Sequence, residues 1–118
     1  MNLSLIAPYI MLLVSINAYR IDHNLKPVSL NNDTCILATQ RLGDIEGYFS
    51  HVLLVPRVHA DNIGGWTHEN LAKGFTDYKD VLKGWEESPT HNANLLSDSK
   101  YGCIASDGHY WTLEMNKP

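Results

Sequence analysis

Residues 85–96 read WEESPTHNANLL, and they contain the sharpest change of local structure that the sequence predicts. Apolar residues at helical spacing lead into this stretch, namely Tyr78, Val81, Leu82 and Trp85. They predict a helix that begins at Thr76 or Asp77. This helix should end at Ser88, because a proline disfavours helical geometry in the residue before it. A short further turn of helix is expected over residues 90–96.

The chain after this stretch predicts a β-hairpin. Residues 101–105 and 109–115 are two strand-like runs, and Asp107-Gly108 between them is a strong signal for a tight turn. Strand periodicity then sorts the second run into two faces, with Trp111, Leu113 and Met115 on one and Tyr110, Thr112 and Glu114 on the other.

The chain before this stretch predicts a strand and a further helix. Residues 66–72 are expected to be a short strand, whereas residues 48–55 only approach strand geometry before Pro56 interrupts them. Residues 31–34 supply several helix N-caps, and Gly43 or Gly47 would end the helix that follows. Its apolar positions are Cys35, Leu37, Ala38, Leu42 and Ile45.

The beginning of the chain allows two interpretations. Residues 3–16 are apolar and resemble the core of a secretory signal, but no lysine or arginine precedes them. They are also too short for a convincing transmembrane helix. The favoured alternative is a buried helix from about Pro8 to about Asn24. Without a convincing signal peptide, a cytoplasmic or virion-associated location is expected rather than classical secretion.

Composition limits the class of protein. A chain of 118 residues with 44% hydrophobic residues fits one folded domain over residues 1–118. Its net charge of −4 argues against a nucleic-acid partner. Cys35 and Cys103 could pair only if their Cα atoms approach to about 4.4–6.8 Å. Two reduced thiols are the default inside a cell. Helices and strands are segregated along the chain, which predicts an α+β domain with an antiparallel sheet.

Several segments together resemble the CAP superfamily (cysteine-rich secretory, antigen 5, pathogenesis-related 1; SCP-like) in its short bacterial or phage form. The resemblance covers about residues 10 to 116. Its words are residues 16–28 (similar to INxxR…xGLxPL), 49–51 (FSH), 68–74 (similar to GENLAxG), 85–96 (similar to WxxSPGHRxNIL) and the closing pair 101–103 and 110–112. The resemblance implies a three-layer α/β/α sandwich around a mostly antiparallel sheet, with the first helix part of the core.

The sequence also departs from the family pattern. His68 replaces the usual glycine, and Leu113 stands where the closing word usually has glutamine. Ser88 occupies the place of the second glutamate of eukaryotic members, so their acidic cavity is not reproduced in full.

The resemblance implies a cleft in which His51, Glu69 and His91 converge. Two imidazoles and a carboxylate could bind a divalent metal such as zinc and leave a fourth position for water. They could also act as a general acid and base, or hold a polar ligand by hydrogen bonds. Against this stand ordinary structural roles: a surface or hydrogen-bonded core histidine at His51, a residue that caps a turn at His91, or a carboxylate that accepts backbone N–H groups at Glu69. His109 and Trp66 are candidates for the cleft edge.

Other residues are expected to be structural: Asn17, Arg20, Asn70 and Trp85. The predicted function is a binding or interaction module that uses the cleft, at a cell envelope or within a larger assembly such as a phage particle. Its partner would be a protein or an envelope component, with a lipid as a further candidate. The alternative is a zinc-assisted hydrolase, most plausibly a peptidase, that uses the same cleft. No cofactor is certain.

Overall fold

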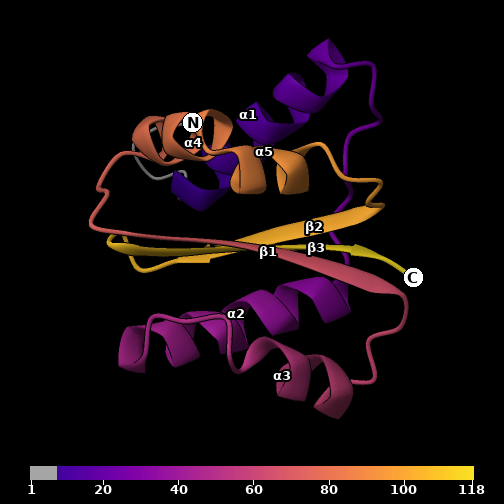
Figure 1. Ribbon diagram of the computed structural model, residues 1–118, viewed down its shortest axis with the longest axis vertical. Helices are drawn as coiled ribbons and strands as arrows, with labels where there is room; N and C mark the ends of the chain where they lie inside the picture. The colour runs from indigo at the N-terminus through magenta and orange to yellow at the C-terminus, as the bar shows by residue number, and fades with distance from the viewer. Residues whose placement is uncertain (1–7) are drawn as a thin grey trace, which may run out of the picture.

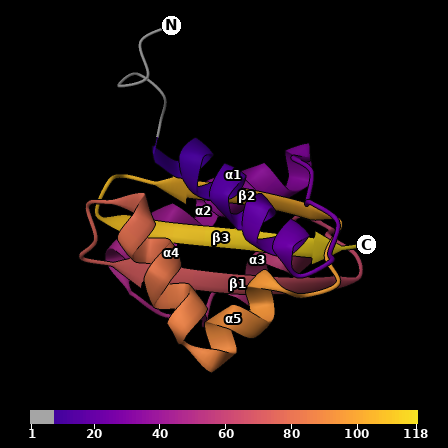
Figure 2. The same ribbon diagram turned by 90° about the horizontal axis from the view of Figure 1, so that it is seen from above.

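A computed structural model describes residues 8–118 of the chain (Figure 1). The elements follow in the order α1 (Pro8–Asp22), α2 (Asn32–Gly47), α3 (Leu54–Ala60), β1 (Trp66–Lys73), α4 (Tyr78–Glu87), α5 (Pro89–Leu95), β2 (Tyr101–Ser106) and β3 (Tyr110–Lys117). Helices α1, α4 and α5 cover one face of the sheet, and α2 and α3 cover the other (Figures 1 and 2). The three layers are those that the sequence predicted.

The sheet has three antiparallel strands in the order β1-β3-β2. The central strand β3 pairs with both neighbours, so Glu114 lies opposite Glu69 of β1 and Cys103 of β2. Helices cover both faces, and therefore both side-chain sets of β3 are buried, including Trp111, Met115 and Glu114. A strand with two covered faces explains why its apolar and polar residues are buried alike.

The largest apolar cluster lies between the sheet and the layer of α1, α4 and α5. It includes Leu12 and Ile16 of α1, Val81 and Trp85 of α4, and Trp111 of β3. Burying each such side chain contributes roughly 1.5–3 kcal/mol, so this cluster is the main source of hydrophobic stabilisation in the fold. Trp85 also donates its indole N–H to the carbonyl of Leu71 at 3.1 Å, which fixes α4 on β1.

Local capping explains where the helices begin. The side chain of Asn31 accepts a hydrogen bond from the backbone N–H of Thr34 at 2.9 Å, and α2 starts at the next residue, Asn32. Asp77 caps α4 in the same way. Pro89 occupies the first turn of α5, where a missing N–H is tolerated. The helices predicted before Gly47 and before Ser88 are confirmed.

One local prediction is wrong. Residues 48–55 were expected to approach strand geometry, but α3 begins at Leu54 and runs through Pro56. Pro56 is the third residue of that helix. The N–H groups of a first turn have no partner inside the helix, so a proline does not interrupt it there.

The first helix is part of the core, with Leu12 and Ile16 fully buried. Its buried Arg20 donates to backbone carbonyls of Lys26, Leu95, Ser97 and Ser99. Asn17 exchanges two hydrogen bonds with the backbone of Val28, at 2.8 and 3.0 Å. These contacts fix the returning chain to α1. The part of the signal-peptide interpretation that concerns residues 1–7 lies outside the described residues. Between residues 8 and 118, no helix has the length and apolar character needed to cross a bilayer.

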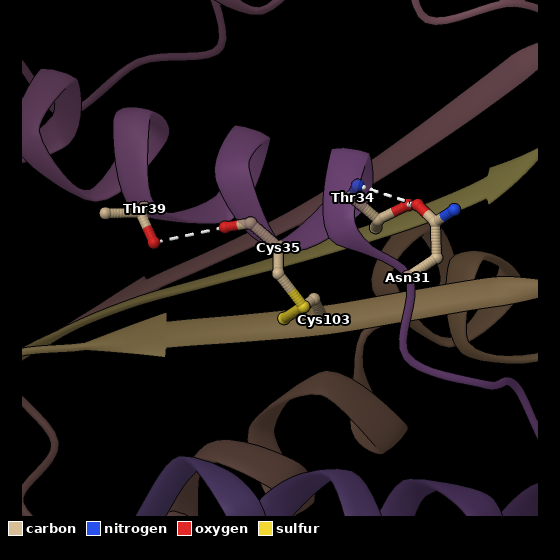
Figure 3. Close-up of a disulfide and its surroundings, with 5 residues drawn as sticks. All are labelled: Asn31, Thr34, Cys35, Thr39 and Cys103. Carbon is tan, nitrogen blue, oxygen red and sulfur yellow. Dashed lines mark hydrogen bonds between the residues drawn. A yellow bond between two sulfur atoms is a disulfide. The ribbon is translucent and has the colours of Figure 1, made fainter.

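A disulfide joins the second layer to the sheet. Cys35 of α2 and Cys103 of β2 are bonded, with their Cα atoms 5.1 Å apart and 68 positions apart in sequence (Figure 3). The sequence left this pairing open, with reduced thiols as the default. The crosslink attaches the N-terminal half of α2 to the edge strand β2.

Candidate functional site

The candidate cleft lies at the free edge of β1. Glu69 is in the middle of this edge strand and its side chain is 1% exposed. His51, in the connection between α2 and α3, places its Nδ1 2.7 Å from Oε1 of Glu69. An ionised carboxylate only accepts hydrogen bonds, so Nδ1 of His51 carries the proton in this contact, and Nε2 is the ring nitrogen left for other partners. The side chain of His51 is 59% exposed, so this pair connects a buried carboxylate with the surface.

Arg41 of α2 holds Glu69 from beneath the sheet. Its Nε donates to Oε2 of Glu69 at 2.7 Å and its Nη2 donates to Oε1 at 3.0 Å. The same guanidinium donates to Asp44 and to the carbonyl of Ser50, immediately before His51. Arg41 is completely buried. A two-pronged bond of this kind fixes the carboxylate in position as well as in charge.

The charge of Glu69 depends on this contact. Burial by itself would raise the pKa of Glu69, but hydrogen bonds from Arg41 and the interactions with Glu114 and His51 outweigh it and lower the pKa. Glu69 is therefore ionised.

The pKa of Glu114, which lies opposite Glu69 on β3, is shifted in the opposite direction. Glu114 is completely buried, and burial together with the Glu69 carboxylate raises its pKa well above the usual range. Its Oε2 accepts from the hydroxyl of Thr112 at 2.6 Å, and its Oε1 has no hydrogen-bond partner among residues 8–118. Two carboxyl groups of opposite protonation state therefore lie side by side beneath the cleft.

His91 reaches the edge of β1 from the other layer. It lies in the short helix α5, and its Nδ1 is 2.7 Å from the hydroxyl of Ser88. Its backbone carbonyl accepts from the side chain of Asn70 at 3.0 Å, which fixes α5 on β1. Burial and the neighbouring charge of His51 lower the pKa of His91, so its ring is neutral near neutral pH.

Glu69 and Asn70 alternate along β1, so they point to opposite faces of the sheet. Glu69 faces α2 and Asn70 faces α5, as their hydrogen bonds show. His51 and His91 therefore approach the strand from opposite layers, with Glu69 bonded to His51 alone.

The described residues contain no group of three or more His, Cys, Asp or Glu side chains placed to hold a metal ion. The two oxygens of Glu69 already accept hydrogen bonds from Arg41 and His51. The divalent metal such as zinc that the resemblance implies for His51, Glu69 and His91 stays a prediction.

The two candidates for the cleft edge lie at opposite ends of β1. Trp66 is the first residue of the strand and is 75% exposed. His109 is exposed in the β2–β3 turn, where its carbonyl accepts from Gly74 just beyond the other end of β1. His68 adjoins Glu69 on β1, and strand alternation directs it to the opposite face, as the sequence predicted.

Sequence reasoning missed the residues that surround Glu69. Arg41 lies four residues after Leu37 and four before Ile45, so helical spacing already placed it on the buried face of α2. Glu114 lies between two buried apolar residues, but only the strand register shows that it faces Glu69. Asp44 and Arg57, which pair at 2.9 Å, extend the charged network from α2 to α3.

Comparison with known proteins gives a consistent family. The sequence pattern of the family described as "CAP: Cysteine-rich secretory protein family" matches residues 13–113. A comparison with curated proteins finds no match.

Several solved structures resemble the chain, among them the following three. An extracellular protein containing an SCP domain from Bacillus anthracis has a TM-score of 0.85 and 24% identity, over 94% of this chain and 40% of that one. A cysteine-rich secretory protein from Staphylococcus aureus has a TM-score of 0.83 and 22% identity, over 92% of this chain and 37% of that one. An outer surface protein from Borrelia burgdorferi has a TM-score of 0.72 and 18% identity, over 91% of this chain and 90% of that one. The chain thus spans about two fifths of the length of the first two proteins.

These descriptions contradict one expectation. A cytoplasmic or virion-associated location was predicted because no basic residue precedes the apolar N-terminal stretch. The similar structures are described as extracellular, secretory or outer surface proteins, which points to secretion rather than to the cytoplasm. The error arose because the lack of a recognisable signal peptide was used as evidence for an intracellular location.

The family pattern covers most of the chain, and the solved structures share its three-layer fold. The chain belongs to the cysteine-rich secretory protein family, CAP.

Proposed function

We propose that this CAP domain is a binding module that acts outside the cytoplasm and holds a polar component of the cell envelope at the edge of β1. The ligand would accept or donate hydrogen bonds at the Nε2 atoms of His51 and His91. Hydroxyl and amide groups, such as those of peptidoglycan, have the matching chemistry.

The carrying observation is the state of Glu69. Both its oxygens accept hydrogen bonds from Arg41 and His51, and its side chain is 1% exposed. A carboxylate in this position orients His51 but is not free to activate a water molecule. This arrangement supports binding more than hydrolysis.

The imidazole rings of His51 and His91 are oriented in the same way by the residues around them. Each uses Nδ1 for an internal hydrogen bond, His51 with Glu69 and His91 with Ser88. Neither Nε2 has a hydrogen-bond partner among the described residues. Rings that are oriented in advance lose less freedom when a ligand binds, and this favours affinity.

The location outside the cytoplasm has two supports. Disulfides persist in oxidising compartments, and this chain has one between Cys35 and Cys103. In addition, the similar structures are described as extracellular, secretory or outer surface proteins.

Cosedimentation tests the proposal. The protein is mixed with purified peptidoglycan sacculi and, separately, with anionic phospholipid vesicles, and casein hydrolysis is followed with and without zinc. We expect cosedimentation with sacculi, loss of it in the His51→Ala/His91→Ala double variant, and retention of it in His59→Ala. His59 is an exposed histidine of α3 and is the matched control.

Three results would contradict the proposal. Equal sedimentation of the double variant would place binding elsewhere on the molecule. Sedimentation with vesicles but not with sacculi would make a lipid the partner in place of peptidoglycan. Casein hydrolysis that the double variant loses would favour the zinc-assisted hydrolase.

A further inference from the structure

A concave surface lies at the edge of the sheet opposite the strand that carries Glu69. Figure 2 shows β2 on the other side of the central strand β3 from β1. The concave surface is a hollow of about 500 Å³ lined by residues of α1, α2 and β2. Its walls are mostly apolar and include Tyr9, Ile10 and Leu13 of α1 and Leu42 of α2. We call it the β2-edge groove. The proposed function does not use it.

The floor of this groove is the unpaired side of a strand. The backbone N–H of Gly102 points away from β3 and donates to the carbonyl of Ser29 at 3.0 Å. Backbone groups alternate in direction along a strand, so those of Ile104 point the same way. Among residues 8–118, no hydrogen bond reaches the outer N–H or carbonyl of Ile104.

The chain itself already shows how this edge is paired. Ser29 forms a parallel bridge with Tyr101, and its N–H donates to the carbonyl of Lys100 at 2.9 Å. The chain then turns away into α2 at Asn32. Within residues 8–118, the pairing therefore stops after Gly102, and no strand lies along the rest of the outer edge of β2.

The surface around the groove is apolar as well. Ile10 is 49% exposed, Val14 58% and Leu30 65%. Exposed apolar residues that gather beside a concave surface are typical of an interaction site.

The unpaired backbone selects the class of occupant. A lipid tail or the side of a helix would fill the apolar volume but leave the Ile104 N–H and carbonyl without partners and without water, which is unfavourable. An extended peptide satisfies both requirements, since its backbone pairs with the strand edge while alternate side chains enter the pocket.

We propose that the β2-edge groove binds an extended segment of another protein, which adds a strand beside β2 and inserts alternate apolar side chains between α1 and α2. The segment continues the line of pairing that Ser29 begins.

A peptide library tests this proposal. The probes are hexapeptides in which Val, Ile, Leu or Phe alternate with Thr, together with the same peptides N-methylated at the amides that would face β2. We expect library members to bind, and amide hydrogen exchange at Ile104 to slow by about tenfold or more at saturation. N-methylated peptides should bind at least about tenfold more weakly, because they lose backbone hydrogen bonds.

A pair of variants locates the site. Thr39 is exposed on α2 and lines the groove, so Thr39→Arg should block it and weaken binding by about tenfold or more. Thr76→Arg makes the same exchange at an exposed position outside the groove and should bind like the parent.

Four results would overturn the proposal. The first is that no library member binds. The second is that N-methylated peptides bind equally well, which would mean that apolar contacts in the groove are enough for binding. The third is that palmitate binds in the groove and peptides do not. The fourth is that hydrogen exchange at the Ile104 amide slows as the protein concentration rises without peptide, which would make a second copy of the chain the occupant.

Discussion

The disulfide between Cys35 and Cys103 gives the most quantitative prediction about this domain. Its reduction removes a crosslink from the unfolded chain without changing any residue. The two cysteines are 68 positions apart, and the chain-entropy relation for a loop of that length gives about 4.4 kcal/mol. We therefore expect reduction to lower the free energy of unfolding by about 4 kcal/mol, a large share of the stability of a domain of this size.

The assay is urea unfolding followed by circular dichroism, with and without a reducing agent. A Cys35→Ala/Cys103→Ala variant should unfold at nearly the midpoint of the reduced parent, and the reducing agent should leave its midpoint unchanged. This variant is the control for effects of the reagent itself. Thiol titration of the untreated, denatured protein should find no free thiol among the two cysteines. Free thiols in protein purified under oxidising conditions, or equal midpoints for the oxidised and reduced forms, would refute the reasoning.

Three further predictions concern the charges beneath the cleft. Arg41→Met leaves the Glu69 carboxylate buried without its main partner, and should lower the free energy of unfolding in urea by about 3–5 kcal/mol. The same exchange at the half-exposed Arg57 is the control and should change that free energy by about 1 kcal/mol or less. Equal effects of the two variants would contradict the central role of Arg41. The pKa of Glu114 is raised in the folded state, so the stability that this group contributes is present at low pH and is lost as the pH rises above its pKa in the unfolded chain. The Glu114→Gln variant should therefore gain stability relative to the parent between about pH 4 and pH 7. A difference in stability between the two proteins that does not change with pH would contradict this. The pKa of His91 is lowered in the folded state, so the unfolded chain takes up protons first and stability falls as the pH drops below about 6.5; His91→Gln should reduce that fall, and an unchanged pH profile would show that His91 is not shielded.

The parts of the fold with strong local signals were predictable from the sequence. Asn31 and Asp77 cap helices where their side chains suit the N-terminus of a helix, and Asp107-Gly108 forms the predicted turn. Such signals act within a few residues and depend little on the rest of the chain. In α3, by contrast, the sequence predicts a break at Pro56, although the place of this proline in the first turn is compatible with a helix.

The candidate site was predictable only in part, because its contacts join distant parts of the chain. Arg41 and Glu69 are 28 positions apart, and Glu114 meets Glu69 only through the register of β1 and β3. Helical spacing could have placed Arg41 on a buried face, but nothing local shows which acid it binds. The proton on Glu114 likewise follows from its burial beside a second carboxylate, which is a property of the folded sheet.

The division of roles within each imidazole is the central claim, and nitrogen NMR of the two rings tests it most directly. The protein is labelled with ¹⁵N-histidine, and lysozyme-solubilised peptidoglycan fragments are added. The account predicts that the Nε2 resonances of His51 and His91 shift with added fragments, while Nδ1 of His51 keeps the proton that it donates to Glu69. Unchanged Nε2 resonances at saturating fragments, or loss of the proton from Nδ1 of His51, would contradict it.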